Sequence, residues 1–318
     1  MRLILLGIVT MGAALGPIVA AAQSVPDLPA AMRPAVKTPE AVGLDGREFF
    51  PPPTSPAAKA VLDANLAATT LDFIRAPDDA QRILWLGRRL GYMARFQDAI
   101  VVFSRGAEKF PDDARFLRHR GHRYVSTRQF DKAIADFQRA AALMANRPDE
   151  EEAVGSASAT RSGTLKFNIY YHMGLAYFLK GDFEQALSAY RECMKYRSDE
   201  ESLVAISDWT YMTLRRLGRD TEAKAFLKPI VPGMAIKDNI SYYQRLLMYK
   251  GLLKPEQVLA ADETDPVQIA TQGYGVGNFY LVKGDTAKAT EIFRRVVAGS
   301  EWGAFGFIAA EADLARMK

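Results

Sequence analysis

The chain has 318 residues, of which 49% are hydrophobic and 25% are charged, which is ordinary for a folded protein and excludes wholesale disorder. Its formal net charge of +4 is too small a basic excess to indicate nucleic acid binding. The single cysteine, Cys193, excludes an intramolecular disulfide bond.

Residues 1–22 have the pattern of a secretory signal peptide. Arg2 is followed by an apolar run over residues 3–15, a helix-breaking Gly16-Pro17 and an alanine cleavage site at residues 20–22. The apolar run is shorter than a membrane span, and no cysteine near the cleavage site could carry a lipid anchor. We therefore expect an exported protein, periplasmic or secreted, without a stable membrane span.

Residues 23–56 contain eight of the 16 prolines and few large apolar side chains, which indicates a tether and not a packed domain. Phe49 and Phe50 are the exception, and we expect them to dock on the first helical units that follow. Over residues 57–79 apolar side chains recur at helical spacing, which predicts an amphipathic helix that caps the array behind it.

Residues 80–147 carry one pattern of small and aromatic residues twice. Each position recurs 34 residues later: Gly87 as Gly121, Phe96 as Phe130, Ala99 as Ala133 and Phe103 as Phe137. A fixed period of this length indicates stacked structural units. Glycine and alanine let two helices approach closely, and we expect the phenylalanines to fill the seam between them.

This pattern resembles the tetratricopeptide repeat (TPR), a helix-turn-helix unit. The resemblance implies an all-α fold, a right-handed α-α superhelix or solenoid of TPR hairpins. It assigns residues 80–147 to TPR 1 and TPR 2, and Gly174 and Tyr190 place TPR 3 at residues 167–200. Between them, residues 148–166 are an insertion with four adjacent acidic residues and a Ser/Ala-rich part, which we expect to form a loop.

The register continues less regularly toward the C-terminus. Residues 201–237 fit it as a degenerate TPR 4, residues 238–269 as an off-pattern helical pair, and residues 270–301 as TPR 5. Residues 302–318 have an apolar face and a second face with Glu311, Asp313 and Arg316. This pattern predicts an amphipathic helix that caps the open end of the array.

No catalytic motif is present in the sequence, so we do not expect an enzyme or a cofactor. The run Gly273-Tyr-Gly275-Val-Gly277 has the glycine spacing of a dinucleotide loop, but it falls in a predicted helix with no strand before it. Two of its glycines, at 273 and 275, have no other explanation from the sequence. His119, His122 and His172 fall on neighbouring helices, yet spacing places no carboxylate or thiol beside them, so no metal site is expected.

The TPR resemblance also implies which side chains line the concave groove, because certain positions of each first helix point into it. In this sequence they are Arg88, Arg115, Arg118, His122, Asn168, Tyr171, Phe178, Tyr274 and Asn278. The groove is thus basic at its start and aromatic further on, which suits an extended peptide segment with acidic or carboxylate groups. The alternative is that the arginines only solvate a helix face.

We therefore expect a non-catalytic scaffold or adaptor in the cell envelope that binds other proteins through this groove. The C-terminal half is also similar to periplasmic TPR lipoproteins that present murein hydrolases to a processing protease, which implies envelope hydrolases or a protease as partners. The chain lacks the lipidated cysteine of those proteins. The alternative function is an accessory subunit of a cell-envelope hydrolase, or such a hydrolase itself. Homo-oligomer formation is left open.

Overall fold

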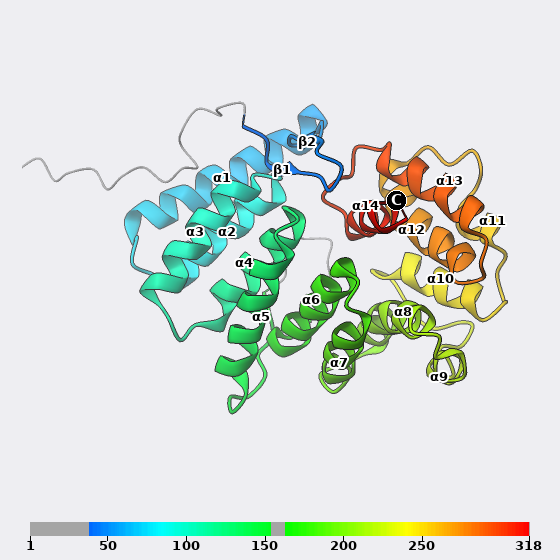
Figure 1. The fold of residues 1–318 in the computed structure, drawn as a ribbon. Coiled ribbons are helices and arrows are strands. Elements are labelled where there is room, and N and C mark those ends of the chain that lie inside the picture. The colour runs from blue at the N-terminus through cyan, green and yellow to red at the C-terminus, as the bar shows by residue number, and fades with distance from the viewer. Residues whose placement is uncertain (1–37, 154–162, 318) are drawn as a thin grey trace, which may run out of the picture. The chain divides into compact units, whose positions relative to one another are not determined.

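A computed structural model describes residues 38–153 and 163–317. The expected signal peptide, the first part of the tether and the middle of the insertion lie outside the described residues. Within them the chain forms fourteen α-helices and one two-stranded sheet (Figure 1). The prediction of an all-α superhelical repeat fold is confirmed.

The helices follow one another along the chain, and most successive helices pack as neighbours. The first seven are α1 (Pro56–Arg75), α2 (Ala80–Tyr92), α3 (Phe96–Lys109), α4 (Ala114–Ser126), α5 (Phe130–Met144), α6 (Leu165–Lys180) and α7 (Phe183–Met194). The other seven are α8 (Glu200–Arg216), α9 (Asp220–Phe226), α10 (Ile240–Tyr249), α11 (Pro255–Val258), α12 (Pro266–Leu281), α13 (Thr286–Val297) and α14 (Phe305–Arg316). Of these, α10 packs against α8 and not against α9. Strands β1 (Ala41–Val42) and β2 (Glu48–Phe49) pair antiparallel.

Aspartates begin several of these helices, because a carboxylate accepts hydrogen bonds from the unpaired N–H groups of a first turn. Asp79 accepts from the Arg82 amide at 2.9 Å, and Asp113 accepts from the Arg115 amide at 3.1 Å. At the end of α6, Gly181 adopts a left-handed conformation with φ of 87°, which turns the chain into α7. The repeat boundaries are therefore set by local sequence.

Within each hairpin a glycine of the first helix lies against an aromatic ring of the second. A methyl group on Gly87 would lie 2.4 Å from the Phe103 ring, and one on Gly174 would lie 2.4 Å from the Tyr190 ring. The same relationship joins the pairs Gly121 with Phe137 and Gly277 with Phe293. Closely packed interiors have no room for that methyl group, so glycine at this position fixes the distance between the two helices.

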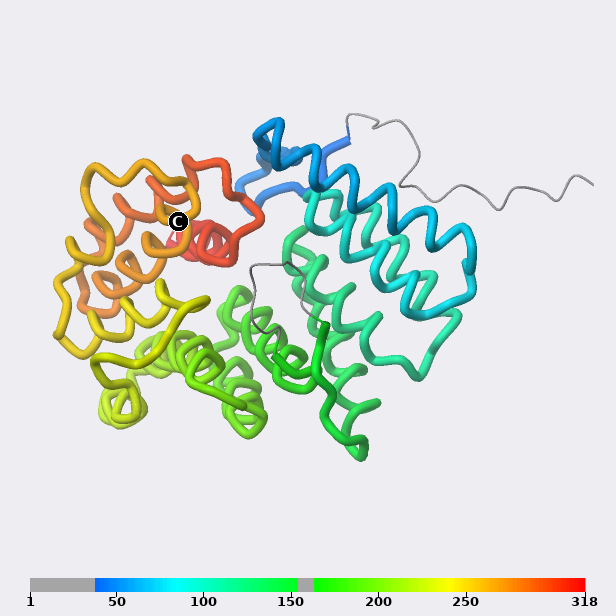
Figure 2. Tube along the Cα trace, turned by 180° about the vertical axis from the view of Figure 1, so that it is seen from behind, coloured from blue at the N-terminus to red at the C-terminus, as the bar shows by residue number. Residues whose placement is uncertain are grey.

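The N-terminal segment of residues 38–55, here called the strap, lies beside α14 at the other end of the chain (Figures 1 and 2). Phe49 stacks on Trp302 with ring centroids 5.3 Å apart, and Phe50 is 44% exposed. Phe49 also contacts TPR 2, because the guanidinium carbon of Arg128 lies 4.9 Å from its ring centroid. The expectation that both phenylalanines dock on the first repeats is therefore corrected only for Phe50, which is exposed. The strap also contacts α3, where Gln97 donates to the Glu40 backbone oxygen at 2.7 Å, so it joins the two ends of the array.

The C-terminal helix α14 does more than cover an open end, because it packs against α6 as well as α12 and α13. Arg316 donates to the backbone oxygen of Leu179 in α6 at 2.8 Å. Its charged face is not solvated: Glu311 and Asp313 are 3% and 1% exposed. Both carboxylates are paired with arginines of other helices or turns. Pairing of this kind is what allows a carboxylate to be buried.

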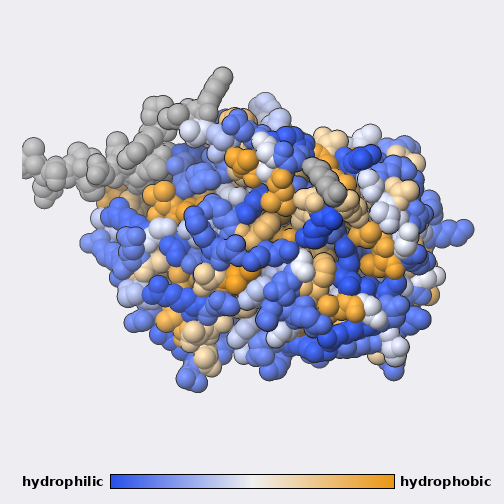
Figure 3. Space-filling view, viewed as in Figure 1, coloured by the Kyte–Doolittle hydropathy of each residue, from blue (hydrophilic) through white to orange (hydrophobic). Residues whose placement is uncertain are grey.

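On the face shown in Figure 3, hydrophobic residues gather in separate areas among hydrophilic ones. Across the described ranges 38–153 and 163–317, the helices are either too short or too polar to cross a membrane.

Candidate partner-binding groove

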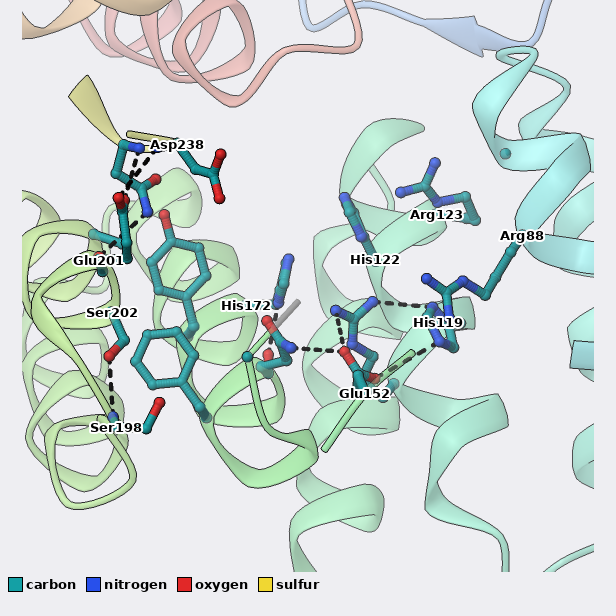
Figure 4. A pocket seen from close by; sticks show the side chains of 18 of the residues that line it. Arg88, His119, His122, Arg123, Glu152, His172, Ser198, Glu201, Ser202 and Asp238 are labelled. Atoms are coloured by element: carbon teal, nitrogen blue, oxygen red, sulfur yellow. Dashed lines mark hydrogen bonds and ion pairs between the residues drawn. The ribbon is translucent and has the colours of Figure 1, made fainter. Parts of the chain in front are cut away.

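A cavity of about 500 Å³ opens between the first helices of TPR 1, TPR 2 and TPR 3 and the start of α8. Cavities of this size are typical of sites for ligands and peptide segments. Its walls come from α2, α4, α6 and α8, together with the two described ends of the insertion and the segment before α10 (Figure 4). The polar residues on them are Arg88, Arg118, His119, His122, Arg123, Glu152, Asn168, His172, Ser198, Asp199, Glu201, Ser202, Asp238 and Asn239.

Two of the predicted arginines are engaged by the insertion. Arg118 forms an ion pair with Glu152 at 2.8 Å between Nη2 and Oε2, and the two side chains are 9% and 6% exposed. Arg88 donates from Nη2 to the backbone oxygen of Ala153 at 2.7 Å. Asn168 donates to the same Glu152 oxygen at 2.6 Å. The chain thus supplies its own negative charge to this part of the cavity.

Arg123, from the last turn of α4, is in a different situation. It packs over the Phe96 ring, with the guanidinium carbon 4.9 Å from the ring centroid. Among the residues that the structure describes, no carboxylate lies within ion-pair distance of it, and none is drawn beside it in Figure 4. Burial, reinforced by the charge of Arg118, lowers the pKa of Arg123 to about 9. It still carries its charge at neutral pH.

His122 lies beside Arg123 in Figure 4, and His172 lies next to His122. The His122 and His172 rings are 4.6 Å apart, and Phe305 of α14 lies 5.2 Å from the first of them. Burial lowers the pKa of both histidines well below 6.5, and nearby arginine charges lower it further, so both are neutral at pH 7. His172 Nδ1 lies 2.6 Å from the Asn168 backbone oxygen, which can only accept. Nδ1 therefore carries the proton, and Nε2 is left as an acceptor.

The opposite wall is acidic (Figure 4). Glu201 of α8 accepts backbone hydrogen bonds from residues 237–239, including the Asn239 amide at 2.9 Å. Asp199 caps α8, and Asp238 and Tyr242 complete this side of the cavity. The cavity is therefore cationic on the α4 side and anionic on the α8 side.

Five of the nine predicted groove residues line this one cavity: Arg88, Arg118, His122, Asn168 and Tyr171. Arg115 lies elsewhere, where it pairs with Asp113 at 2.6 Å and contacts Gln81.

Phe178, Tyr274 and Asn278 are fully buried and cannot contact a partner, so their assignment to the groove is corrected. Phe178 and Tyr274 pack around Trp209, and Asn278 accepts from Arg216 at 2.9 Å. The physical reason is α14, which packs against α12 and covers the surface that these side chains would otherwise line.

Sequence reasoning did not place Arg123 and Glu152 in the cavity, which both of them line. Arg123 is next to His122 in the sequence, but it falls outside the helix positions that the TPR resemblance assigns to the groove. Glu152 belongs to the acidic run that we expected in a loop. Only the fold brings it 2.8 Å from Arg118. In the described ranges no three side chains of histidine, cysteine, aspartate or glutamate are grouped so that they could hold a metal ion.

Comparison with protein families gives one match: residues 167–200 match the tetratricopeptide repeat. These residues are α6 and α7, and their contact between a glycine and an aromatic ring recurs in three other hairpins of the chain. The chain thus contains a tetratricopeptide repeat at residues 167–200. Repeats of this family are generally non-catalytic scaffolds for protein interactions.

Curated proteins give this TPR protein no match. Among solved structures it is similar to a TPR protein from Parabacteroides merdae, with 13% identity, a TM-score of 0.48, and coverage of 82% of this chain and 94% of that one. It is also similar to YrrB, a TPR protein with an unusual peptide-binding site, with 14% identity, a TM-score of 0.42, and coverage of 73% and 92%. A thermophilic TPR protein from Thermus thermophilus has 16% identity, a TM-score of 0.39, and coverage of 76% and 100%.

Proposed function

We propose that this TPR protein is a non-catalytic scaffold that binds a segment of a partner protein in the cavity between α2, α4, α6 and α8. A negatively charged group of the partner sits at Arg123. The observation that carries the proposal is that Arg123 lines the cavity as a cation for which the described part of the chain supplies no carboxylate.

The charge of Arg123 is costly where it stands. Arg123 is half-buried, and even partial removal of a guanidinium from water is unfavourable unless an anion or further hydrogen bonds compensate. Its lowered pKa reflects that cost. A partner carboxylate can offer two oxygens to the planar fork of an arginine. Binding therefore restores the interactions that burial removes from Arg123.

The surroundings favour a peptide over a bare anion. His172 Nε2 is an acceptor that can take a backbone N–H group of a bound segment. Tyr171 and Tyr242 add aromatic surface, which gives contact area at low cost in conformational freedom. The acidic wall at Glu201 and Asp238 then favours a segment that is not negatively charged throughout.

We place this scaffold in the cell envelope, on the strength of the signal-peptide pattern in residues 1–22, with envelope proteins as partners. Fractionation of cells tests the location, since a cytoplasmic, uncleaved product would contradict it.

The experiment that tests the function is site-directed photo-crosslinking in the native host. A crosslinking residue replaces Tyr242 at the cavity in one variant and Arg139, exposed on α5, in the control. The proposal expects a protein partner at position 242 and none at position 139. Equal adducts at both positions, or none at 242, would argue against the cavity as the binding site.

A further inference from the structure

The second anion subsite of the cavity is already filled by the chain itself. Glu152 lies against Arg118 and Asn168, at 2.8 Å and 2.6 Å, and its neighbour Ala153 accepts from Arg88. Arg88, Arg118 and Asn168 could otherwise donate to a carboxylate of the partner. In this structure they donate to residues 152 and 153 of the chain itself.

The backbone holds Glu152 in this place. Glu151 forms an isolated β-bridge with Thr164, and the Glu152 amide donates to the Gly163 backbone oxygen at 3.0 Å. The Leu165 amide in turn donates to the Glu150 backbone oxygen at 2.7 Å. Backbone hydrogen bonds thus hold the two described ends of the insertion together at the start of α6. They place the Glu152 carboxylate beside Arg118 of α4.

The pair is also incomplete. Arg118 Nε and Glu152 Oε1 are buried without a hydrogen-bond partner, and His119 Nε2 is 3.7 Å from that oxygen. An external carboxylate in this place that bound the arginine fork through both of its oxygens could accept from Arg118 Nε as well. Glu152 is therefore a weaker occupant of this subsite than a well-placed external carboxylate.

We propose that Glu152 is a specificity-determining residue, which occupies the Arg88 and Arg118 subsite and limits the partner to one anionic anchor, at Arg123. This rests on the proposed function, because it assigns the partner's charge at that same cavity. A segment with several acidic residues gains nothing from its additional charges while Glu152 is in place. It is disfavoured further by the carboxylate of Glu152 and by the acidic wall at Glu201.

The test uses the full chain and two blocked tetrapeptides, one with a single aspartate and one with three, titrated calorimetrically at fixed ionic strength. In the unchanged protein the two peptides should bind within about threefold of each other. In Glu152→Gln the peptide with three aspartates should bind about tenfold or more tighter than the other, the gain of one charge-assisted contact. Adding Arg118→Gln to Glu152→Gln should abolish that preference.

The outcomes separate this inference from the proposed function. If Arg123→Ala weakens both peptides but Glu152→Gln creates no preference, Glu152 does not set specificity and the proposed function stands. If Arg123→Ala has no effect while Glu152→Gln creates the preference, the Glu152 assignment stands and the anchor at Arg123 is wrong. If neither variant changes binding, both are overturned. Should Glu152→Gln fold incompletely by circular dichroism, Glu152→Asp, which withdraws the carboxylate by one methylene, takes its place with the same expected order.

Discussion

Glu311 in α14 accepts a hydrogen bond from Arg128 Nε at 2.9 Å, although 183 positions separate them in the chain. The other Glu311 oxygen accepts the Leu44 amide of the strap at 2.8 Å. Arg128 stands in the α4–α5 turn with a left-handed φ of 61°, where the corresponding turns use Gly181 and Gly284. Such a conformation costs about 1 to 3 kcal/mol for a residue other than glycine. One carboxylate thus joins TPR 2, the strap and the C-terminal helix.

Removing this carboxylate should destabilise the whole protein. Glu311→Ala leaves Arg128 buried without its partner, which typically costs about 3 to 5 kcal/mol. Urea unfolding followed by circular dichroism measures the loss. The matched control is Asp63→Ala, which removes an exposed pair with Lys59 and should cost less than about 1 kcal/mol. Equal stability of the two variants would show that the contacts of Glu311 with Arg128 and the strap contribute nothing to the free energy of unfolding.

Gly275→Ala should also be costly, and this explains a glycine for which the sequence offered no reason. Its methyl group would lie 2.0 Å from Arg245 Cδ. Arg245 cannot move aside, because it is 1% exposed and paired with the buried Asp208. Overpacking of this kind costs about 1 to 3 kcal/mol. Gly303→Ala, whose methyl group would meet the Phe96 ring at 3.4 Å, serves as the control in thermal unfolding and should change stability by less than about 1 kcal/mol.

The buried histidines should make stability fall in mild acid. The folded-state pKa of His172 is lowered well below 6.5, so below pH 6.5 the unfolded chain binds the proton more readily, and stability is lost as pH falls. The loss per histidine is at most about 1.4 kcal/mol per pH unit. Asp208 has the opposite effect on stability. Burial raises its pKa in the folded protein to about 6, so the folded state binds this proton more readily than the unfolded chain and gains stability as the pH falls below about 6.

A comparison of two proteins isolates the histidine effect. His172→Gln keeps an N–H donor for the Asn168 backbone oxygen but cannot be protonated, and Asp208 is common to both proteins. Between pH 7 and pH 5 the variant should therefore lose less stability in urea unfolding than the unchanged protein. Identical losses would mean that His172 is not kept neutral by the fold.

The seam between the two helices of each hairpin could be predicted from sequence, because it depends on residues close together in the chain. Gly87, for example, leaves room for the Phe103 ring. The contact between the strap and the C-terminal part of the chain could not be predicted. Phe49 and Trp302 come together only through the combined geometry of every hairpin between them. The groove was half predictable for the same reason. That Arg118 and His122 line the cavity could be predicted from their positions in one helix. The burial of Tyr274 could not, because it depends on the packing of α14, which is distant in the sequence.

Arg123 should anchor the partner, and one titration tests this most directly. The segment recovered by crosslinking is titrated against the unchanged protein, Arg123→Ala and the matched exposed control Arg139→Ala, with circular dichroism to verify each fold. Loss of a charge-assisted contact costs about 1.5 to 3 kcal/mol, so Arg123→Ala should weaken binding roughly tenfold or more, while Arg139→Ala should leave it unchanged. Equal affinities for all three proteins would contradict the account.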